Sequence, residues 1–284
     1  MAALLILLSN CANLAEGVFI KKYNSRHQKG GFLFTGLISL FAMVFFLITD
    51  TGGLHFPPEL FLYGIISGIL YCSASFLTYV ALGCGSFALS MLILSYSLVF
   101  SIGYGLIFLK ETATVFTWLG LGIMLISLYL TRADKKEGSI RITPKWLICI
   151  GLSVIGSGMF AVVSRMQQIR FQDANTNEFM ILSLGLSAAI LLLLGLIKDG
   201  KDLKYILKYG SGYAISAGLL NGACNLLGLI VNTMIPLSIA APSKAGTKII
   251  LSFLMSRLIF KEKFLPRQIV GVLLGAAALV LLNL

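Results

Sequence analysis

ILSLGLSAAILLLLGLI is the sequence of residues 181–197, and it is apolar on every face with no charged residue. Apolar runs of about 17 to 25 residues recur along the chain, which is the length of helix that crosses a hydrocarbon core of ~30 Å. A barrel strand would instead alternate apolar and polar residues over about ten positions. The pattern therefore predicts an all-α integral membrane protein.

The composition of the whole chain agrees with that prediction. Of 284 residues, 58% are hydrophobic and 12% are charged, and the mean hydropathy is +0.94. An average soluble domain carries roughly 25% charged residues, so a water-soluble fold is excluded. We interpret the first apolar run as a helix and not as a secretory signal, because no basic residue precedes it and Lys21 and Lys22 follow it.

Ten membrane-spanning helices with short connections are predicted. Their ranges are 2–20, 31–48, 60–82, 86–109, 114–131, 146–168, 178–197, 210–234, 237–260 and 267–283. The segment 132–145 is charged and lies halfway along the chain, as a linker would. We therefore expect a first five-helix repeat at 1–131, a charged linker at 132–145 and a second five-helix repeat at 146–284.

Lysine and arginine are distributed unequally between alternate loops. Sixteen of them lie around residues 21–29, 132–145, 198–208 and 261–267, whereas the other side has three, namely Lys110, Arg165 and Arg170. The positive-inside rule places the richer side in the cytoplasm, so with ten spans both termini are expected outside a cell membrane that the chain crosses repeatedly. We interpret the net charge of +11 as this topology signal. Its dispersal over four short loops argues against a nucleic-acid partner.

The two halves of the chain resemble each other. GLIFLKE at residues 105–111 corresponds to RLIFKE at residues 257–262, and Gly-rich helices with WLG at 118–120 and IVG at 269–271 follow. Working backward, YCSAS at 71–75 corresponds to NGACN at 221–225. An odd number of spans in each unit turns the second unit upside down, and inverted repeats form substrate sites near the membrane midplane. We therefore expect two inverted five-helix repeats around a central cavity, with transport by alternating access.

These paired motifs resemble the drug/metabolite transporter superfamily, specifically its EamA-type members, over nearly the whole chain. The resemblance implies a ten-helix transporter fold with a central cavity. Relatives carry amino acids, sugars, nucleotide sugars, drugs and lipid-linked sugars, so the resemblance leaves the substrate open. The superfamily is usually drawn with both termini in the cytoplasm, which is opposite to the orientation that the loop charges predict.

The first half is also similar to the small multidrug resistance proteins. Their first helix carries an Ala-Glu pair that binds protons and cations, and Ala15-Glu16 stands in the first predicted helix here. YCSASF at 71–76 is similar to a motif of their third helix, although a gap is needed to align Lys22. This similarity implies that Glu16 couples transport to protons.

Three ionisable residues lie well inside the predicted spans, namely Glu16, Lys244 and Lys248. Arg165 and Arg257 lie near helix ends, where we interpret their side chains as extending to the membrane interface. Such a group costs roughly 2.5 to 3.5 kcal/mol at the centre of a membrane helix, so it normally faces a cavity or a partner. Lys244 and Lys248 share one helix face, at depths of about 10 and 16 Å from a helix start near residue 237. The pair predicts either an anionic group between the two lysines or one lysine that is deprotonated. A structural ion pair is the alternative. Pro242 is expected to weaken the same helix.

Uncharged polar residues accompany these charges. They are Asn10 and Asn13 near Glu16, Tyr71 and Ser75, Tyr96 and Ser97, and Asn221 and Asn225. Spacings of three or four residues place most of these groups on one helix face. We interpret them as substrate-binding residues of a polar cavity, with hydrogen bonds between membrane helices as the alternative for any single amide.

Candidate catalytic groups are missing from the sequence. His27 and His55 lie in loops without a carboxylate cluster or a metal-ligand set, so we expect no enzyme, no metal and no cofactor. Without a Walker A motif, direct ATP hydrolysis is excluded. We predict a secondary active transporter, an exporter or exchanger, for a small anionic or zwitterionic metabolite such as an amino acid. It would act in the lipid bilayer as a monomer or homodimer, with a proton as coupling ion. A drug or lipid-linked sugar translocator, a passive channel and a permease subunit are the alternatives.

Overall fold

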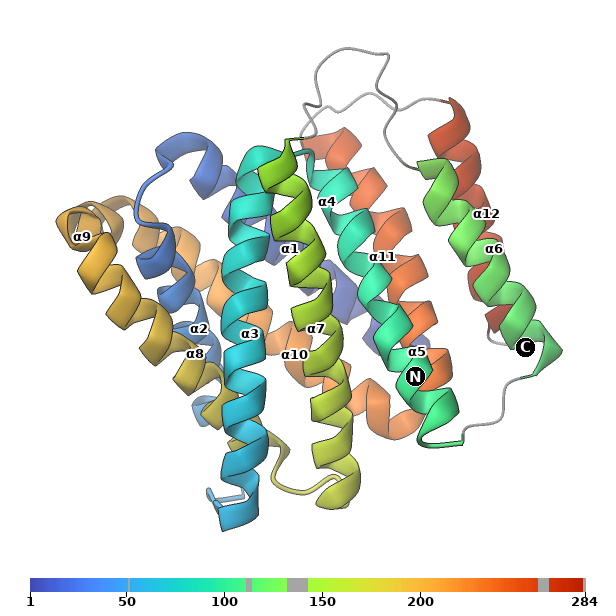
Figure 1. The fold of residues 1–284 in the computed structure, drawn as a ribbon, viewed down its shortest axis with the longest axis horizontal. Helices are drawn as coiled ribbons and strands as arrows, with labels where there is room; N and C mark the ends of the chain where they lie inside the picture. The colour runs from blue at the N-terminus through green and yellow to red at the C-terminus, as the bar shows by residue number, and fades with distance from the viewer. Residues whose placement is uncertain (51, 111–113, 132–142, 260–265, 283–284) are drawn as a thin grey trace.

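The computed structural model describes residues 1–50, 52–110, 114–131, 143–259 and 266–282, and these residues form helices and connections without a β-strand (Figure 1). Within this part of the chain, seven helical stretches are long and apolar enough to cross a membrane by length and composition. The prediction of an all-helical, multi-pass membrane protein is confirmed. Residues 132–142 of the expected linker lie outside the described residues, as do Glu111, Lys261 and Glu262 of the repeat motif.

The helices follow the apolar runs of the sequence. In the first half they are α1 (Ala2–His27), α2 (Gly31–Thr49), α3 (Pro58–Cys84), α4 (Phe87–Leu94), the 3-10 turn η1 (Ser95–Ser97), α5 (Leu98–Ile107) and α6 (Val115–Thr131). In the second half they are α7 (Pro144–Arg170), α8 (Thr176–Lys198), the 3-10 turn η2 (Gly200–Asp202), α9 (Leu203–Tyr205), the π-helix η3 (Ile206–Gly210), α10 (Ser211–Met234), α11 (Leu237–Ile259) and α12 (Pro266–Leu282).

Three predicted spans differ in detail from the structure. The first, predicted at 2–20, continues as α1 to His27, so the prediction that His27 lies in a loop is wrong. The span 86–109 is interrupted by η1, where the Ser95 hydroxyl donates a hydrogen bond to the Met91 carbonyl at 2.9 Å. Such a bond to the preceding turn often bends a helix. By contrast, α11 runs unbroken through Pro242, which the sequence marks as the weak point. Pro242 lies near the start of α11, where its missing donor removes one hydrogen bond.

Helices from the two halves of the chain interleave. α1 packs along α10, α3 packs along α7, α2 contacts α8 and α10, and α3 contacts α8. α6 packs along α12, and Figure 1 shows this pair at one side of the bundle. The contact between α10 and α2 is close, since a Cβ atom on Gly218 would lie 2.7 Å from the Ile38 carbonyl oxygen.

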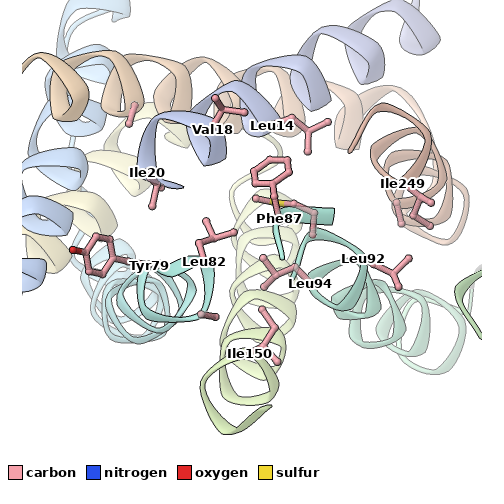
Figure 2. Close-up of a cluster of buried hydrophobic side chains, with 14 of the residues drawn as sticks. Leu14, Val18, Ile20, Tyr79, Leu82, Phe87, Leu92, Leu94, Ile150 and Ile249 are labelled. Atoms are coloured by element: carbon pink, nitrogen blue, oxygen red, sulfur yellow. The ribbon is translucent and has the colours of Figure 1, made fainter. Parts of the chain in front are cut away.

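A buried apolar cluster joins α1 to the helices around it. Figure 2 shows Leu14 and Val18 of α1 pointing toward Phe87 of α4, with Ile249 of α11 beside them. Leu14, Phe87 and Ile249 are fully buried. The cluster packs one face of α1 against its neighbours and leaves the polar side chains on the other faces.

The two ends of the bundle differ in charge. The turn between α1 and α2 and helix α9 lie at the upper end of Figure 1, which we call the basic end because it carries the lysines and arginine of 21–29 and 198–208. Both chain termini are marked in the lower half of the same view. We call the end below them, where α10 meets α11, the opposite end.

Candidate functional site

A cavity of ≈ 230 Å³ lies between the helices of the two halves. Eight of the eleven site residues predicted from the sequence line it, namely Asn13, Glu16, Tyr71, Ser75, Ser97, Asn221, Asn225 and Lys248. They come from α1, α3, η1, α10 and α11. Residues from both halves of the chain therefore line one cavity, and their role in substrate binding stays a prediction.

Asn221 is the centre of a hydrogen-bond network in this cavity. Its Oδ1 accepts from the Tyr71 hydroxyl at 2.7 Å and from Nδ2 of Asn225 at 2.9 Å. Because both neighbours donate to the oxygen, the amide nitrogen is directed at the carboxylate of Glu16, with Nδ2 to Oε1 at 2.9 Å. The network thus sets the orientation of one carboxylate oxygen.

Glu16 is almost entirely buried, at 9% exposure. Asn13 approaches its second oxygen, with Nδ2 to Oε2 at 3.5 Å. Among the described residues no lysine or arginine lies within 4 Å of the carboxylate to form an ion pair. The carboxylate therefore depends on two amides and on the cavity, which is an energetically expensive arrangement inside a membrane.

Lys248 faces the same cavity from α11. The structure gives its ammonium group no hydrogen bond and no ion pair to any described residue. A half-buried ammonium without a protein partner is available to a ligand. The cavity therefore presents one accessible cation and one amide-held carboxylate.

Lys244, Asn10 and Tyr96 do not line the cavity. The Lys244 ammonium donates to the Gly228 carbonyl at 2.9 Å and to Oδ1 of Asn232 at 2.7 Å, both on α10. Nδ2 of Asn10 donates to the Lys244 carbonyl at 2.8 Å. The two lysines therefore have different surroundings. Lys248 faces the cavity, whereas Lys244 connects α11 to α10 and α1 through hydrogen bonds.

Tyr96 packs against the apolar cluster of Figure 2. Its neighbour Ser97 is the residue of the pair that reaches the cavity. Adjacent residues in a helical turn point in different directions, and here only the second residue of the pair reaches the cavity.

The model of the EamA-like transporter family matches residues 142–284, slightly more than half of the chain. The chain belongs to this family. As an EamA-like transporter it is a membrane transporter of the drug/metabolite type, which indicates a transporter rather than an enzyme. The family resemblance predicted from the repeat motifs is confirmed.

Two further comparisons bear on this EamA-like transporter. No curated protein matches its sequence. One solved crystal structure of a protein superposes with a TM-score of 0.67 over 97% of the chain and 98% of that protein, at 13% identity. At that identity the likeness shows a shared fold alone.

Sequence reasoning missed several residues that line the cavity of this EamA-like transporter. Thr35 on α2 and Thr78 on α3 add hydroxyl groups, and Ser157 and Phe160 on α7 add a hydroxyl and an aromatic ring. The rings of Phe160 and Tyr71 meet edge to face with centroids 5.3 Å apart. A lone threonine or phenylalanine in an apolar run carries no periodic signal, so only the packing of α2 and α7 shows these residues.

The cavity extends toward the basic end of the EamA-like transporter. Beyond Glu16, its lining continues to Ile20, Leu82 and Met91, close to the α1–α2 and α3–α4 turns. Toward the opposite end, the lining stops short of Lys244 and Asn10. The bonded Lys244 cluster, made of Lys244, Asn10, Gly228 and Asn232, therefore lies beyond the lining of the cavity, toward the opposite end.

Proposed function

We propose that this EamA-like transporter is a secondary active exporter or exchanger of a small zwitterionic or anionic metabolite such as an amino acid. The observation that carries the proposal is the pair of opposite charges that line one cavity, the ammonium of Lys248 and the carboxylate of Glu16. The carboxylate of the substrate binds Lys248 through a charge-assisted hydrogen bond. Its ammonium or amide group binds near Glu16, and Asn225 and Tyr71 contact the polar remainder.

The size of the cavity supports a metabolite over the alternatives. Its volume of ≈ 230 Å³ is below the roughly 300–1,000 Å³ of pockets that hold drug-sized ligands. A lipid-linked sugar is larger still. A small, charged and hydrogen-bonding ligand fits both the volume and the lining.

We also propose that the chain crosses the membrane ten times as two inverted five-helix repeats, with a division at 132–145. The helix contacts support this, because α1 with α10 is matched by α7 with α3, and α2 with α10 by α8 with α3. Two hydrogen bonds support it as well. Nδ2 of Asn24 donates to the Tyr79 carbonyl at 2.9 Å, and Nε2 of Gln168 donates to the Leu229 carbonyl at 3.2 Å.

These two bonds occupy corresponding places. Tyr79 lies eight residues beyond Tyr71 on α3, and Leu229 lies eight residues beyond Asn221 on α10, where Tyr71 and Asn221 correspond in the repeat. Each bond ties the end of the first helix of a repeat to the third helix. Equivalent contacts at equivalent positions are what a duplicated unit produces.

Alternating access then follows from the difference between the two ends. The cavity extends toward the basic end, and the Lys244 cluster closes the opposite end. Passage to the other side requires the hydrogen bonds of Lys244 to Gly228 and Asn232 to break. We propose that Glu16 carries the coupling proton. It lines the cavity, and its hydrogen-bond partners are neutral amides and not cations.

The proposed orientation follows the loop charges. The basic end faces the cytoplasm, both termini face outward, and the protein resides in the cell membrane. The proposed partners are the substrate, the bilayer and the proton, and the protein acts as a monomer or homodimer.

Counterflow in proteoliposomes tests the proposed function. Vesicles loaded with one unlabelled amino acid receive the same labelled compound outside, and the panel covers the standard amino acids, with a drug dye and a lipid-linked sugar for comparison. Saturable counterflow of an amino acid, abolished in the Lys248→Met variant, is expected. Flux that rises without saturation would show a pore, and counterflow of the dye or the lipid-linked sugar alone would refute the proposed substrate class.

A further inference from the structure

A cluster of aromatic rings surrounds His27 at the basic end of the molecule. Nδ1 of His27 lies 2.8 Å from the Tyr205 hydroxyl. The His27 ring lies with its centroid 5.6, 6.2 and 6.3 Å from those of Tyr205, Tyr209 and Tyr213. We call these four residues the His27 cluster. It joins the end of α1 to the segment from α9 to α10, at the upper left of Figure 1.

The π-helix η3 shapes this cluster. Its wider turns, with bonds from residue i to i+5, bring residues four apart into line, and the rings of Tyr205 and Tyr209 stand 4.9 Å apart. Tyr213 continues the same row into α10. π-Helical turns frequently occur at functional sites. Here the turn builds a row of three tyrosines facing one helix end.

Two cations of the α1–α2 region border the row. Nη1 of Arg26 donates to the Tyr213 hydroxyl at 3.0 Å. Nζ of Lys29 lies 4.9 Å from the centroid of the Tyr205 ring, and the Lys29 carbonyl accepts from the Tyr23 hydroxyl at 2.9 Å, which fixes the backbone beneath it. Both Arg26 and Lys29 are exposed.

A third exposed cation comes from η3 itself. Nζ of Lys208 lies 5.1 Å from the centroid of the Tyr209 ring. Across 21–30 and 198–213 there are eight basic and two acidic residues, and one of the acids, Asp199, accepts a hydrogen bond from the Phe32 backbone at 2.9 Å. Among the described residues, none of these three cations forms an ion pair with a carboxylate. Their charge is therefore available to an external anion.

Exposed apolar side chains occur at the same end of the molecule, and one of them, Leu207, precedes Lys208 in η3. Leu207 of η3 is 53% exposed, and Ile197 at the end of α8 is 80% exposed. Tyrosines and basic residues at the end of a membrane helix lie at the level of the lipid headgroups, and the apolar residues beside them lie at the start of the acyl chains. This end of the molecule therefore combines cations that can bind an anion with exposed apolar side chains.

We propose that the His27 cluster with Arg26, Lys29 and Lys208 is a binding site for the headgroup of an anionic phospholipid. The phosphate contacts the three cations and the hydroxyl of the exposed Tyr209, and the acyl chains lie along Leu207 and Ile197. Because the site joins α1 to α10, a bound lipid holds together two helices that also line the transport cavity.

The experiment uses the purified full chain in a neutral detergent. Short-chain phosphatidylglycerol, short-chain phosphatidylcholine and glycerol 3-phosphate are titrated while the thermal unfolding midpoint is followed, and native mass spectrometry counts the bound lipids. Phosphatidylglycerol is expected to raise the midpoint and to remain bound, and phosphatidylcholine is expected to do neither. An equal effect of glycerol 3-phosphate at the same concentration would show a simple anion site and overturn the lipid proposal.

The variant Arg26→Gln, Lys29→Gln, Lys208→Gln removes the three cations. Since a basic residue near an anionic membrane surface contributes about a fivefold gain in affinity, the dissociation constant of phosphatidylglycerol is expected to rise at least tenfold. The single change Arg26→Gln gives a fivefold rise and serves if the triple variant is unstable. An unchanged affinity in either variant contradicts the proposal.

The matched control is Lys22→Gln, Lys201→Gln, Lys204→Gln. These lysines are exposed at the same end and make no ring contact or ion pair among the described residues, so the net charge changes equally. The control is expected to keep its affinity for phosphatidylglycerol. If it loses as much affinity as the first triple variant, attraction is diffuse and no specific site exists.

Discussion

Replacing Lys248 by methionine is expected to lower the affinity for the substrate without preventing folding. The methionine keeps an unbranched stem of similar volume and removes the charge. Because the Lys248 ammonium has no hydrogen-bond partner among the described residues, the change leaves no protein acceptor unsatisfied. We therefore expect the variant to fold, and to be equal or higher in stability, since an unpaired charge inside a membrane is costly.

The loss in binding is set by the contact that the ammonium makes with the substrate. A hydrogen bond between charged groups, away from water, contributes about 1.5 to 3 kcal/mol. Its removal should weaken the binding of an amino acid roughly 10- to 150-fold. The measurement is isothermal titration of the purified protein with the amino acid that gives the strongest counterflow, together with the thermal unfolding midpoint.

Lys244→Met is the matched control, because the residue is of the same type on the same helix. Its removal leaves the Gly228 carbonyl and Oδ1 of Asn232 buried without their donor, at about 1–3 kcal/mol for each acceptor. We expect lower stability with affinity changed much less than in Lys248→Met. If Lys248→Met folds and binds the substrate as tightly as the wild type, the reasoning is wrong. If it unfolds and Glu16→Gln restores folding, the two residues form a structural pair.

Glu16→Gln should abolish accumulation driven by a pH gradient and leave exchange, as measured in proteoliposomes, and normal accumulation would show that Glu16 has a structural role. Gly218→Ala should lower stability by about 1–3 kcal/mol in thermal unfolding, because its Cβ atom would lie 2.7 Å from the Ile38 carbonyl oxygen. Gly103→Ala is its control, with no atom within 4 Å, and should be neutral or stabilising. A C-terminal reporter that is active only in the cytoplasm should stay dark, and a bright signal would reverse the proposed orientation.

The helices could be predicted from the sequence because their signal is local. An apolar run such as 181–197 predicts a membrane-spanning helix, and α8 covers that run. The 3-10 turn at Ser95–Ser97 was missed, since it depends on a hydrogen bond from Ser95 to the Met91 carbonyl that any serine in a helix can form or omit. Pro242 was the more conspicuous signal, and the helix continued through it.

The charged residues of the site could be predicted, and their partners could not. Glu16 and Lys248 stand out because a charge in an apolar run needs an explanation. One partner of Lys244 is the carbonyl of Gly228, and a backbone carbonyl has no identity in a sequence. The other is the side chain of Asn232, which only the packing of α10 against α11 brings near. A Cβ atom at position 228 would lie 3.7 Å from the Lys244 ammonium nitrogen, which is an ordinary van der Waals contact, so the bond to Lys244 depends on the backbone there and not on the missing side chain.

The proposed repeats place unlike residues at corresponding positions, and transport of a zwitterion requires that difference. Tyr71 and Ser75 of α3 correspond to Asn221 and Asn225 of α10, yet only Asn221 contacts the carboxylate of Glu16. Two identical halves would offer two equal charges and would suit a symmetric ligand. A ligand with one positive and one negative end needs a carboxylate from one half and an ammonium from the other. Glu16 on α1 supplies the carboxylate, and Lys248 on α11 supplies the ammonium. In the proposed transport cycle the two related repeats exchange the open side of the cavity, while these two unlike charges hold the substrate in one orientation.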